Sequence, residues 1–545
     1  MEIPELEISE GTSRRRVPIG KKPITIGRHE DNQLIISDNR ASRYHCVVEM
    51  TDKGLLLTDL NSRNGTLVNG APVKKTLLNT RDVITIGQIT IKVLLPEPEV
   101  EEAELEEVPD EPAEPVELDP VVHLQKTAAS LADNGVNEAD INLLNARNLM
   151  VHPGRVAQPR KPGAPPDIVD ILRNLLLVCF RSRASDIHIE PKNDDYVIRM
   201  RIDGNMVELL RLAKEFGLKL TAVVKILCDI DIGQRGSVQE GHFTVKLPDR
   251  RVDYRVSFAP AVYGQKLVIR VLDTAGAPQY LWNLGMAKPL FETMQKAIQN
   301  ESGSIIVCGP TGSGKTTTLY AVVRSMDSGE RNIVTIEDPV EIQIDGVTQI
   351  PVTAENTFSL LLKSVLRQDP DAMLVGEVRD TETAKTAMQA AITGHLVFTT
   401  LHSRDTVGAL FRLLDLGVEP YLAASAVQVI LAQRLVRKLC QNCKKAVRAT
   451  GVQQAKMAVI GEVTRVYEPV GCPKCLGTGY LGRQCVFELL NMNEAMRDIV
   501  MRSPNLPDIQ RALMDMDFVS LQQSGYALVA EGVTSFTEVE RAVSV

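Results

Sequence analysis

Aromatic side chains and long apolar runs are scarce in this sequence. Only 4% of its 545 residues are Phe, Trp or Tyr, and one is tryptophan. No apolar stretch approaches the ~18 residues that a membrane-spanning helix needs, and the acidic start, MEIPELEISE, lacks the apolar segment of a secretory signal. These absences predict a soluble, cytoplasmic chain. The few aromatics also offer little surface on which nucleic-acid bases could stack.

Charge is unevenly distributed along the chain. The formal net charge is −8, and residues 96–120 hold 12 acidic residues, no basic residue and six prolines. We interpret this segment as a solvated linker. Without its −12, the rest of the chain carries +4, which supplies no concentrated basic stripe. The sequence therefore predicts no nucleic-acid partner.

The first 95 residues have the pattern of an all-β sandwich. Short alternating apolar runs such as ITIGR and VITIG are separated by Gly, Asn and Asp. The stretches GRHEDNQLIISDNRASRYHC and DLNSRNGTLVNG resemble a forkhead-associated (FHA) domain. This resemblance implies that Arg28, Ser42 and Arg43 contact the phosphate of a phosphothreonine peptide and that Asn64 holds the peptide backbone. Alternatively, the module serves only as a docking surface.

A phosphate-binding loop is indicated by SIIVCGPTGSGKTTTLYAVV at 304–323. An apolar strand, a GxxxxGKT turn and a helix follow one another, as this motif requires. Backbone N–H groups would surround the phosphates of ATP, Lys315 would neutralise the β and γ oxygens, and Thr316 would ligate Mg²⁺. The predicted nucleotide-binding residues here are Gly309, Pro310, Thr311, Gly312, Ser313, Gly314, Lys315, Thr316 and Thr317.

Three further stretches each run from apolar into polar residues: VTIEDPVE, LRQDPDAMLVGEVRD and TGHLVFTTLHSRD. Buried parallel strands deliver such polar residues to one edge of a sheet. With the phosphate loop, these stretches resemble the Asp box, Walker B and His box of the ATPases of type II secretion and type IV pilus assembly. The resemblance extends from about residue 167 to the C-terminus.

The resemblance implies roles for several of these polar residues. Glu377 would orient or deprotonate the attacking water, while Glu337 and Glu341 would support Mg²⁺ and its waters. His395 and His402 would sense the nucleotide state. Spacing alone instead favours histidines that satisfy buried carbonyl groups at a strand end.

Alternating strands between residues 184 and 273, beginning with ASDIHIEP, resemble the second N-terminal domain of these ATPases. In the family this domain lends arginines to the nucleotide, and the matching positions are Arg199, Arg201, Arg255 and Arg270. A solvated polar face would explain about half of them equally well.

Four cysteines lie in two CxxC pairs, CQNC and CPKC. Such pairs are typical of a structural zinc site, whereas a redox role would require disulfides in a reducing cytoplasm. The predicted ligands are Cys440, Cys443, Cys472 and Cys475. In the family this insert is common in assembly ATPases and usually absent from retraction ATPases, which favours assembly or export.

The resemblance implies a homo-hexameric, cytoplasmic ATPase that powers type IV pilus assembly or type II protein secretion. An inner-membrane platform protein would recruit it to the inner face of a bacterial cell membrane, and the FHA domain would add phosphothreonine-dependent recruitment. Its cofactors would be ATP, Mg²⁺ and Zn²⁺. The alternative is a signalling adaptor that reads phosphothreonine and whose ATPase body is a conformational switch.

The predicted fold is multidomain. The domains are an FHA-like all-β sandwich at 1–95, an acidic linker at 96–120, a short helical segment with a proline-rich linker at 121–166, a PAS-like α+β domain at 167–280, and a RecA-like α/β ATPase domain at 281–545 with a zinc-binding insert at 440–475.

Overall fold

The chain folds into two units, Met1–Pro115 and Val116–Val545. The computed structural model describes residues 5–10, 13–19, 23–51, 54–60, 62–69, 71–78, 82–87, 89–94, 119–157, 165–273, 276, 278–326, 329–502 and 504–543. The predicted acidic linker therefore lies outside the described residues, apart from residues 119 and 120.

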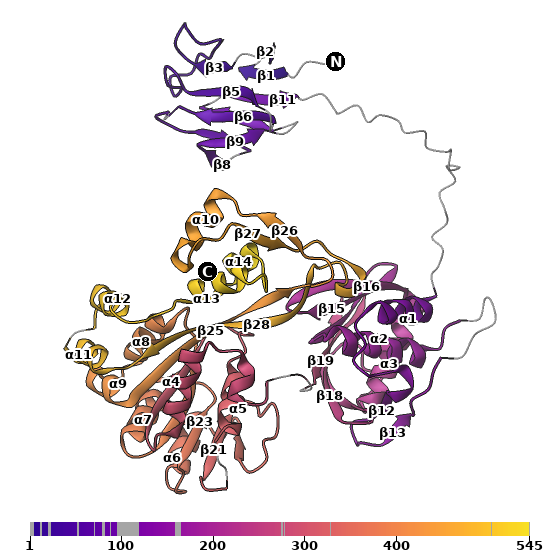
Figure 1. Ribbon diagram of the computed structural model, residues 1–545. Helices are drawn as coiled ribbons and strands as arrows, with labels where there is room; N and C mark the ends of the chain where they lie inside the picture. The colour runs from indigo at the N-terminus through magenta and orange to yellow at the C-terminus, as the bar shows by residue number, and fades with distance from the viewer. Residues whose placement is uncertain are drawn as a thin grey trace. The chain divides into compact units, whose positions relative to one another are not determined.

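The N-terminal unit is a sandwich of two β-sheets (Figure 1), as the sequence predicts. The strand orders are β2-β1-β11-β10-β7-β8 and β4-β3-β5-β6-β9. Alternate side chains such as Ile24 and Ile26, or Ile84 and Ile86, are buried in one core because successive residues of a strand face opposite sides. The strands are β1 (Glu5–Glu10), β2 (Ser13–Pro18), β3 (Ile24–Gly27), β4 (Leu34–Ile35), β5 (Cys46–Thr51), β6 (Gly54–Asp59), β7 (Thr66–Val68), β8 (Ala71–Val73), β9 (Lys75–Leu78), β10 (Val83–Ile86) and β11 (Ile89–Leu94).

A second domain follows, in which helices pack on one face of an eight-stranded antiparallel sheet. The strand order is β13-β12-β17-β18-β19-β14-β15-β16. Its elements are α1 (Pro120–Ser130), η1 (Glu138–Asp140), β12 (Asn142–Leu144), β13 (Met150–His152), α2 (Ile168–Ser182), β14 (Asp186–Pro191), β15 (Asp195–Ile202), β16 (Asn205–Ala213), α3 (Lys214–Leu227), β17 (Gln239–Lys246), β18 (Arg251–Ala261) and β19 (Gly264–Leu272).

Residues 121–166 differ from the expectation of a helical segment and a linker. The helix is present as α1, but β12 and β13 join the edge of the second-domain sheet, where Leu143 pairs with Val245 of β17. These strands have three residues each. β13 pairs with β12, and β12 pairs with β17, which lies far along the chain. Such short strands show no periodicity that a sequence pattern could reveal.

The ATPase core is built on a seven-stranded sheet of order β22-β21-β23-β24-β20-β25-β28, parallel except for the pair β25 and β28. Alternate residues of β20 belong to two different apolar clusters: Ile306 to one that includes residues of α6–α9, and Ile305 to one that includes residues of α4 and α5. Helices thus cover both faces of the sheet, which explains why β20, β21, β23 and β24 are buried at every position. The predicted α/β core is confirmed.

The elements of the sheet and its covering helices are η2 (Leu281–Leu284), α4 (Lys288–Gln299), β20 (Gly303–Cys308), α5 (Lys315–Arg324), β21 (Ile333–Glu337), β22 (Thr348–Pro351), α6 (Phe358–Val365), β23 (Ala372–Val375), α7 (Thr381–Ile392), β24 (Leu396–Leu401), α8 (Thr406–Asp415), α9 (Pro420–Ala426), β25 (Val427–Leu439) and β28 (Tyr480–Asn491).

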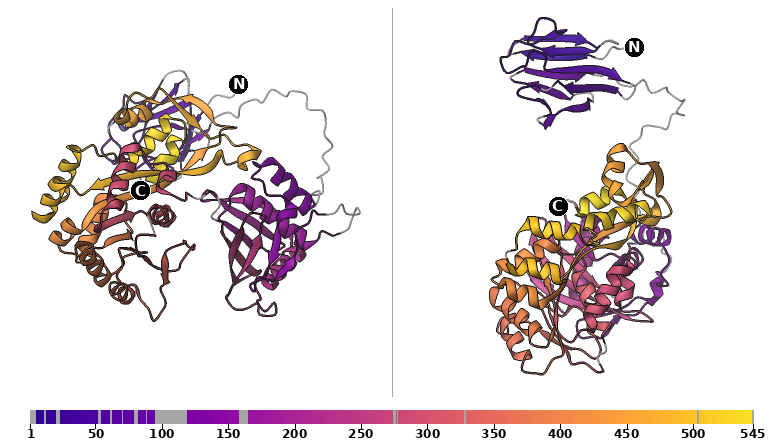
Figure 2. Two further views of the ribbon diagram at one scale, coloured as in Figure 1. Left: turned by 60° about the horizontal axis from the view of Figure 1, so that its bottom comes forward. Right: turned by 60° about the vertical axis from the view of Figure 1, so that its left-hand side comes forward.

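The cysteine-containing insert lies between β25 and β28, and the last two helices, α13 and α14, pack against these strands (Figures 1 and 2). The insert comprises β26 (Lys445–Arg448), α10 (Gly451–Met457), η3 (Ala458–Ile460), β27 (Arg465–Glu468) and η4 (Pro473–Cys475). The last helices are α11 (Glu494–Arg502), α12 (Leu506–Met514), α13 (Leu521–Ala530) and α14 (Phe536–Val543). No helix in the described part of the chain is long and apolar enough to cross a bilayer.

Candidate functional site

The glycine-rich turn joins the end of β20 at Cys308 to the start of α5 at Lys315. Gly312 and Gly314 have φ values of 77° and 88°, in the left-handed region that favours glycine. A side chain at Gly309 would place its Cβ 2.7 Å from the backbone oxygen of Gln433, so a bulkier residue would displace the turn. All of the predicted loop residues lie in this turn or in the first turn of α5: Gly309, Pro310, Thr311, Gly312, Ser313, Gly314, Lys315, Thr316 and Thr317.

Lys315 folds back onto the turn. Its Nζ donates to the carbonyl oxygens of Gly309 (3.0 Å) and Pro310 (3.2 Å). Burial lowers the pKa of Lys315 below its ordinary value. An ammonium group beside the N-terminus of α5 gives the turn the positive character that suits phosphate.

Gln433 on β25 stabilises this turn through hydrogen bonds of its side chain. The side chain is fully buried. Its Oε1 accepts a hydrogen bond from Thr318 of α5 (2.8 Å), and its Nε2 donates to the backbone oxygen of Ser313 (2.7 Å). One side-chain amide therefore forms hydrogen bonds with both the helix and the turn.

Neighbouring parallel strands carry polar residues to the same edge of the sheet. Ile336 is in register with Val375, and Val375 is in register with Thr399. The residues that follow them in the next row are Glu337, Gly376 and Thr400. The Thr400 hydroxyl donates to the carbonyl oxygen of Gly376 (2.7 Å), which fixes the backbone immediately before Glu377.

The Glu337 carboxylate is buried and receives three hydrogen bonds. Oε1 accepts from the Thr335 hydroxyl (2.5 Å) and from Nε2 of Gln349 (3.1 Å), and Oε2 accepts from the Tyr320 hydroxyl. Both oxygens of this buried carboxylate therefore have hydrogen-bond donors within the protein.

Glu377 contacts two cationic or titratable side chains. It forms an ion pair with Arg379, and Nε2 of His402 lies 3.7 Å from its Oε2. Glu377 is largely buried, with 15% of its side chain exposed, whereas the imidazole of His402 is 54% exposed. His402 is therefore accessible to a ligand that approaches Glu377.

These groups surround one cleft of about 1020 Å³, at the upper end of the range of ligand sites. Predicted site residues that line it are Thr311, Gly312, Gly314, Lys315, Thr316, Thr317, Glu337, Glu341, Glu377 and His402. Second-domain residues, including Arg183 and Asp203, form part of another wall. The structure thus brings the predicted loop and carboxylates together.

His395 does not join this cleft, in contrast to the expectation for a second histidine sensor. It precedes β24, and its Nδ1 lies 3.1 Å from the carbonyl oxygen of Ala390. A strand rises by about 3.3 Å per residue, so His395 and His402 lie roughly 20 Å apart at opposite ends of β24. The contact of His395 agrees with the alternative interpretation, in which a histidine at a strand end pairs with a backbone carbonyl group.

Three of the predicted arginines form a row on the polar face of the second-domain sheet. Arg201, Asp186, Arg270 and Arg255 are cross-strand neighbours on β15, β14, β19 and β18. The Asp186 carboxylate, with 10% of its side chain exposed, lies 3.5 Å from Nε of Arg201 and 3.3 Å from Nε of Arg270. One carboxylate therefore orients two guanidinium groups.

The fourth arginine, Arg199, pairs with Glu190 at 2.7 Å. Burial opposes ionisation of Glu190, but Arg199 and Lys266 lower its pKa to about 2. Arg255 reaches the ATPase core, where its Nη1 lies 3.6 Å from Glu341. As far as the structure describes the cleft, none of the four arginines lines it.

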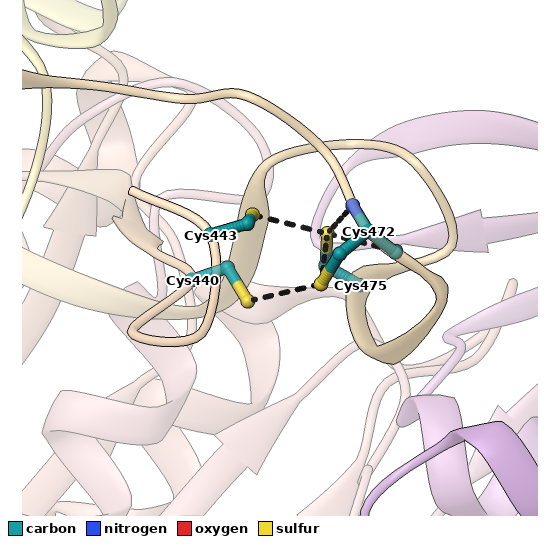
Figure 3. Close-up of side chains that lie close together, drawn as sticks. All are labelled: Cys440, Cys443, Cys472 and Cys475. Carbon is teal, nitrogen blue, oxygen red and sulfur yellow. Dashed lines mark hydrogen bonds between the residues drawn. The ribbon is translucent and has the colours of Figure 1, made fainter. Parts of the chain in front are cut away.

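The four predicted zinc ligands converge at one point (Figure 3). The Sγ atoms of Cys440 and Cys472, and of Cys443 and Cys475, are 3.9 Å apart, and those of Cys472 and Cys475 are 3.7 Å apart. Tetrahedral zinc with Zn–S bonds of about 2.3 Å requires Sγ separations of about 3.8 Å. The backbone N–H of Gly479 also donates to Sγ of Cys475 (3.2 Å). The cluster therefore fits a zinc ion.

In the N-terminal unit, three loops bring the predicted phosphopeptide residues together. The Arg28 backbone N–H donates to the Ser42 carbonyl oxygen (3.1 Å), and Nδ2 of Asn64 donates to the carbonyl oxygen of Arg40 (2.7 Å). The fully buried His45 accepts from the Ser42 backbone N–H at Nδ1 (3.0 Å). Arg28, Arg43 and Asn64 are exposed, so their side chains are accessible to a peptide.

Comparison with known proteins identifies the family. The family model described as type II/IV secretion system protein matches residues 165–541. The chain belongs to this family. An FHA domain model matches residues 24–87. The chain is therefore a secretion ATPase that carries an FHA domain, and the predicted family and enzyme class are confirmed.

Two relatives illustrate the breadth of the family. Type II secretion system protein E of Klebsiella pneumoniae is 39% identical over 376 residues, which cover 69% of this chain and 75% of the relative. The type IV pilus assembly ATPase PilB of Myxococcus xanthus is 37% identical over 383 residues, with 68% and 67% coverage. The X-ray structure of the Legionella pneumophila ATPase DotB has a TM-score of 0.53 at 20% identity and covers 70% of this chain and 97% of that chain, which shows a shared fold.

Some site residues of this secretion ATPase were not predicted from the sequence. Tyr320 and Gln433 lie within apolar runs and have the pattern of core residues. Gln349 lies on the short β22. The ion pair of Arg379 with Glu377 could have been predicted, because the two opposite charges lie two residues apart at the end of a strand.

Proposed function

We propose that this chain is the ring-forming ATPase of a machine that assembles a type IV pilus or secretes proteins by the type II pathway. The supporting observation is the placement of the phosphate loop, Glu337, Glu377 and His402 around one cleft, in a chain that matches the secretion ATPase family over 165–541. A signalling adaptor would need the FHA domain but would not need this set of hydrolytic groups.

The reaction is hydrolysis of ATP to ADP and phosphate. Lys315 leaves the carbonyl oxygens of Gly309 and Pro310 and binds the β and γ oxygens of ATP. Glu377 orients or deprotonates the attacking water after its ion pair with Arg379 opens. His402 contacts the region of the γ-phosphate and so distinguishes ATP from ADP.

Thr316 and Glu337 are the residues that would hold Mg²⁺ or its waters, and Glu341 supports the same side of the cleft. When bound with ATP, Mg²⁺ neutralises charge that develops on the phosphate oxygens. Thr335 and Gln349 orient the Glu337 carboxylate through their hydrogen bonds to Oε1.

The active assembly is a homo-hexamer in which Arg199, Arg201 and Arg270 act on the nucleotide of a neighbouring subunit. Two features support this assignment. These arginines do not line the described cleft of their own chain, and Asp186 and Glu190 hold them on one sheet face. Arg255 instead stays in its own chain beside Glu341. An arginine supplied by a neighbour couples hydrolysis to movement between subunits.

The FHA domain recruits the motor through a phosphothreonine on a partner protein. Arg28, Ser42 and Arg43 bind the phosphate, and Asn64 holds the peptide backbone. The motor works in the cytoplasm at the inner face of the bacterial cell membrane, where it contacts a platform protein. This contact holds it at the membrane.

A structural zinc ion is held by Cys440, Cys443, Cys472 and Cys475, since protein thiolates supply all four ligands. It stabilises the loop that carries Leu476, whose side chain packs against the core of the second domain. Zinc thus supports the junction between this domain and the ATPase core.

Changing Glu377 to Gln tests the hydrolytic site. The substitution keeps the shape of the side chain but removes the base, so ATP turnover falls by at least about 100-fold. Binding of a fluorescent ATP analogue and hexamer formation in Mg·ATP remain, as measured by titration and size-exclusion chromatography.

Glu382→Gln is the matched control. Glu382 is an exposed residue in the first turn of α7 that pairs with Lys363, and this variant retains wild-type turnover. Wild-type turnover by Glu377→Gln would remove Glu377 from the chemistry, and a wild type that is inactive even with platform protein and lipid would contradict the motor.

Elemental analysis of the protein purified under reducing conditions tests the zinc site. One zinc ion per chain is expected. Cys472→Ser should lose it, whereas Cys485→Ser, a change outside the cluster, should retain it. A metal-free wild type that melts at the same temperature with and without added zinc would disprove the assignment.

Binding of the full chain to an oriented library of phosphothreonine peptides tests the FHA domain. Wild type should prefer the phosphorylated library to its unphosphorylated counterpart by tenfold or more, since charge-assisted hydrogen bonds contribute about 1.5–3 kcal/mol each. Arg43→Ala should lose this preference, and Arg16→Ala on β2 should keep it. Equal retention of both libraries by wild type would show that the domain is not a phosphothreonine reader.

A further inference from the structure

Tyr320 connects the helix of the phosphate loop to the Asp-box segment. It lies on α5, five residues after Lys315, and only 2% of it is exposed. Its hydroxyl donates to Oε2 of Glu337 and accepts the backbone N–H of Glu341 (3.2 Å). A single phenol group therefore contacts both ends of the segment 337–341.

The Glu337 carboxylate depends on this contact for its orientation. Thr335 and Gln349 both donate to Oε1, whereas Tyr320 is the donor to Oε2 that the described residues provide. Without the Tyr320 hydroxyl, Oε2 would have to find another donor or the carboxylate would turn. Because Glu337 is 4% exposed, bulk water is a poor substitute.

The position of Tyr320 also suits a link to the nucleotide. α5 starts at Lys315 and Thr316, the residues proposed to bind phosphate and Mg²⁺, and Tyr320 projects from the same short helix onto Glu337. The aromatic ring packs in the apolar cluster shared by α4, α5 and the sheet. Packing therefore fixes the position of the ring, and the hydroxyl points to the Glu337 carboxylate.

We propose that Tyr320 is a positioning residue that holds the Glu337 carboxylate, and with it the start of the Asp box, in a fixed orientation against the phosphate-loop helix. This inference rests on the role proposed above for Glu337 in supporting Mg²⁺ and its waters. Groups that orient metal-supporting carboxylates commonly change metal affinity or activity by 10–100-fold when they are removed.

Tyr320→Phe tests this role, and the chain offers a closely matched control. Tyr526 on α13 is 1% exposed, and its hydroxyl donates to Oε1 of Glu540 (2.7 Å) in the C-terminal helices. Tyr320→Phe and Tyr526→Phe therefore each remove the hydroxyl of a buried tyrosine that donates to a glutamate, and both keep the ring. Melting temperatures of both variants show whether they fold.

Tyr320→Phe should lower kcat for ATP by about tenfold or more. It should also raise the Mg²⁺ concentration needed for half-maximal binding of a fluorescent ATP analogue, a measurement that does not depend on turnover. Tyr526→Phe should match wild type in both measurements. If the two variants show the same kcat and the same Mg²⁺ dependence, Tyr320 has a structural role only and the proposal is wrong.

Glu337→Gln separates this proposal from the role of Glu337 itself. If Glu337→Gln retains wild-type turnover, the proposed role of Glu337 is wrong. If Glu337→Gln is impaired and Tyr320→Phe is not, only the positioning proposal is wrong. The double variant should be no slower than Glu337→Gln, because both changes act through one carboxylate; multiplied losses would contradict positioning.

Discussion

The active cleft depends on parallel strands that are buried on both faces and end in register. Buried strands cannot slip by one residue without moving every side chain to the opposite face. The pairing of Ile336 with Val375 and of Val375 with Thr399 therefore fixes where the polar residues after these strands lie. β20 ends beside β24, so the phosphate loop starts at the same edge.

Polar groups at this edge are held by partners within the protein. Gln433 forms hydrogen bonds with the phosphate turn and with α5. The Glu337 carboxylate accepts hydrogen bonds from Thr335, Gln349 and Tyr320. Burying such groups without partners would cost several kcal/mol each. The same hydrogen bonds that prevent this cost also restrict the carboxylate to one orientation. In the second domain, Asp186 and Glu190 restrict the arginines in the same way.

Local patterns predicted much of this site. A phosphate loop, two CxxC pairs and strand-end carboxylates occupy short stretches whose chemistry follows from spacing. The structure brings the loop and the carboxylates together in the cleft and the four cysteines together in a separate cluster. The sequence did not show that His395 lies away from the cleft, because His395 precedes β24 and His402 follows it, at opposite ends of the strand. β12 and β13 were not predicted because each has only three residues and β12 joins the sheet through β17, which is distant in sequence. Tyr320 was missed because an aromatic residue in an apolar helix has the pattern of the core, and only its hydroxyl reveals another role.

Hydrogen–deuterium exchange of the full chain, with and without a non-hydrolysable ATP analogue and Mg²⁺, tests the central claim that nucleotide binds at the edge where β20, β21 and β23 end. Residues 309–317 and the segment around Glu377 should be protected by the nucleotide, with no change around His395 at the opposite end of β24. Protection around His395 without protection of the phosphate loop would contradict this claim.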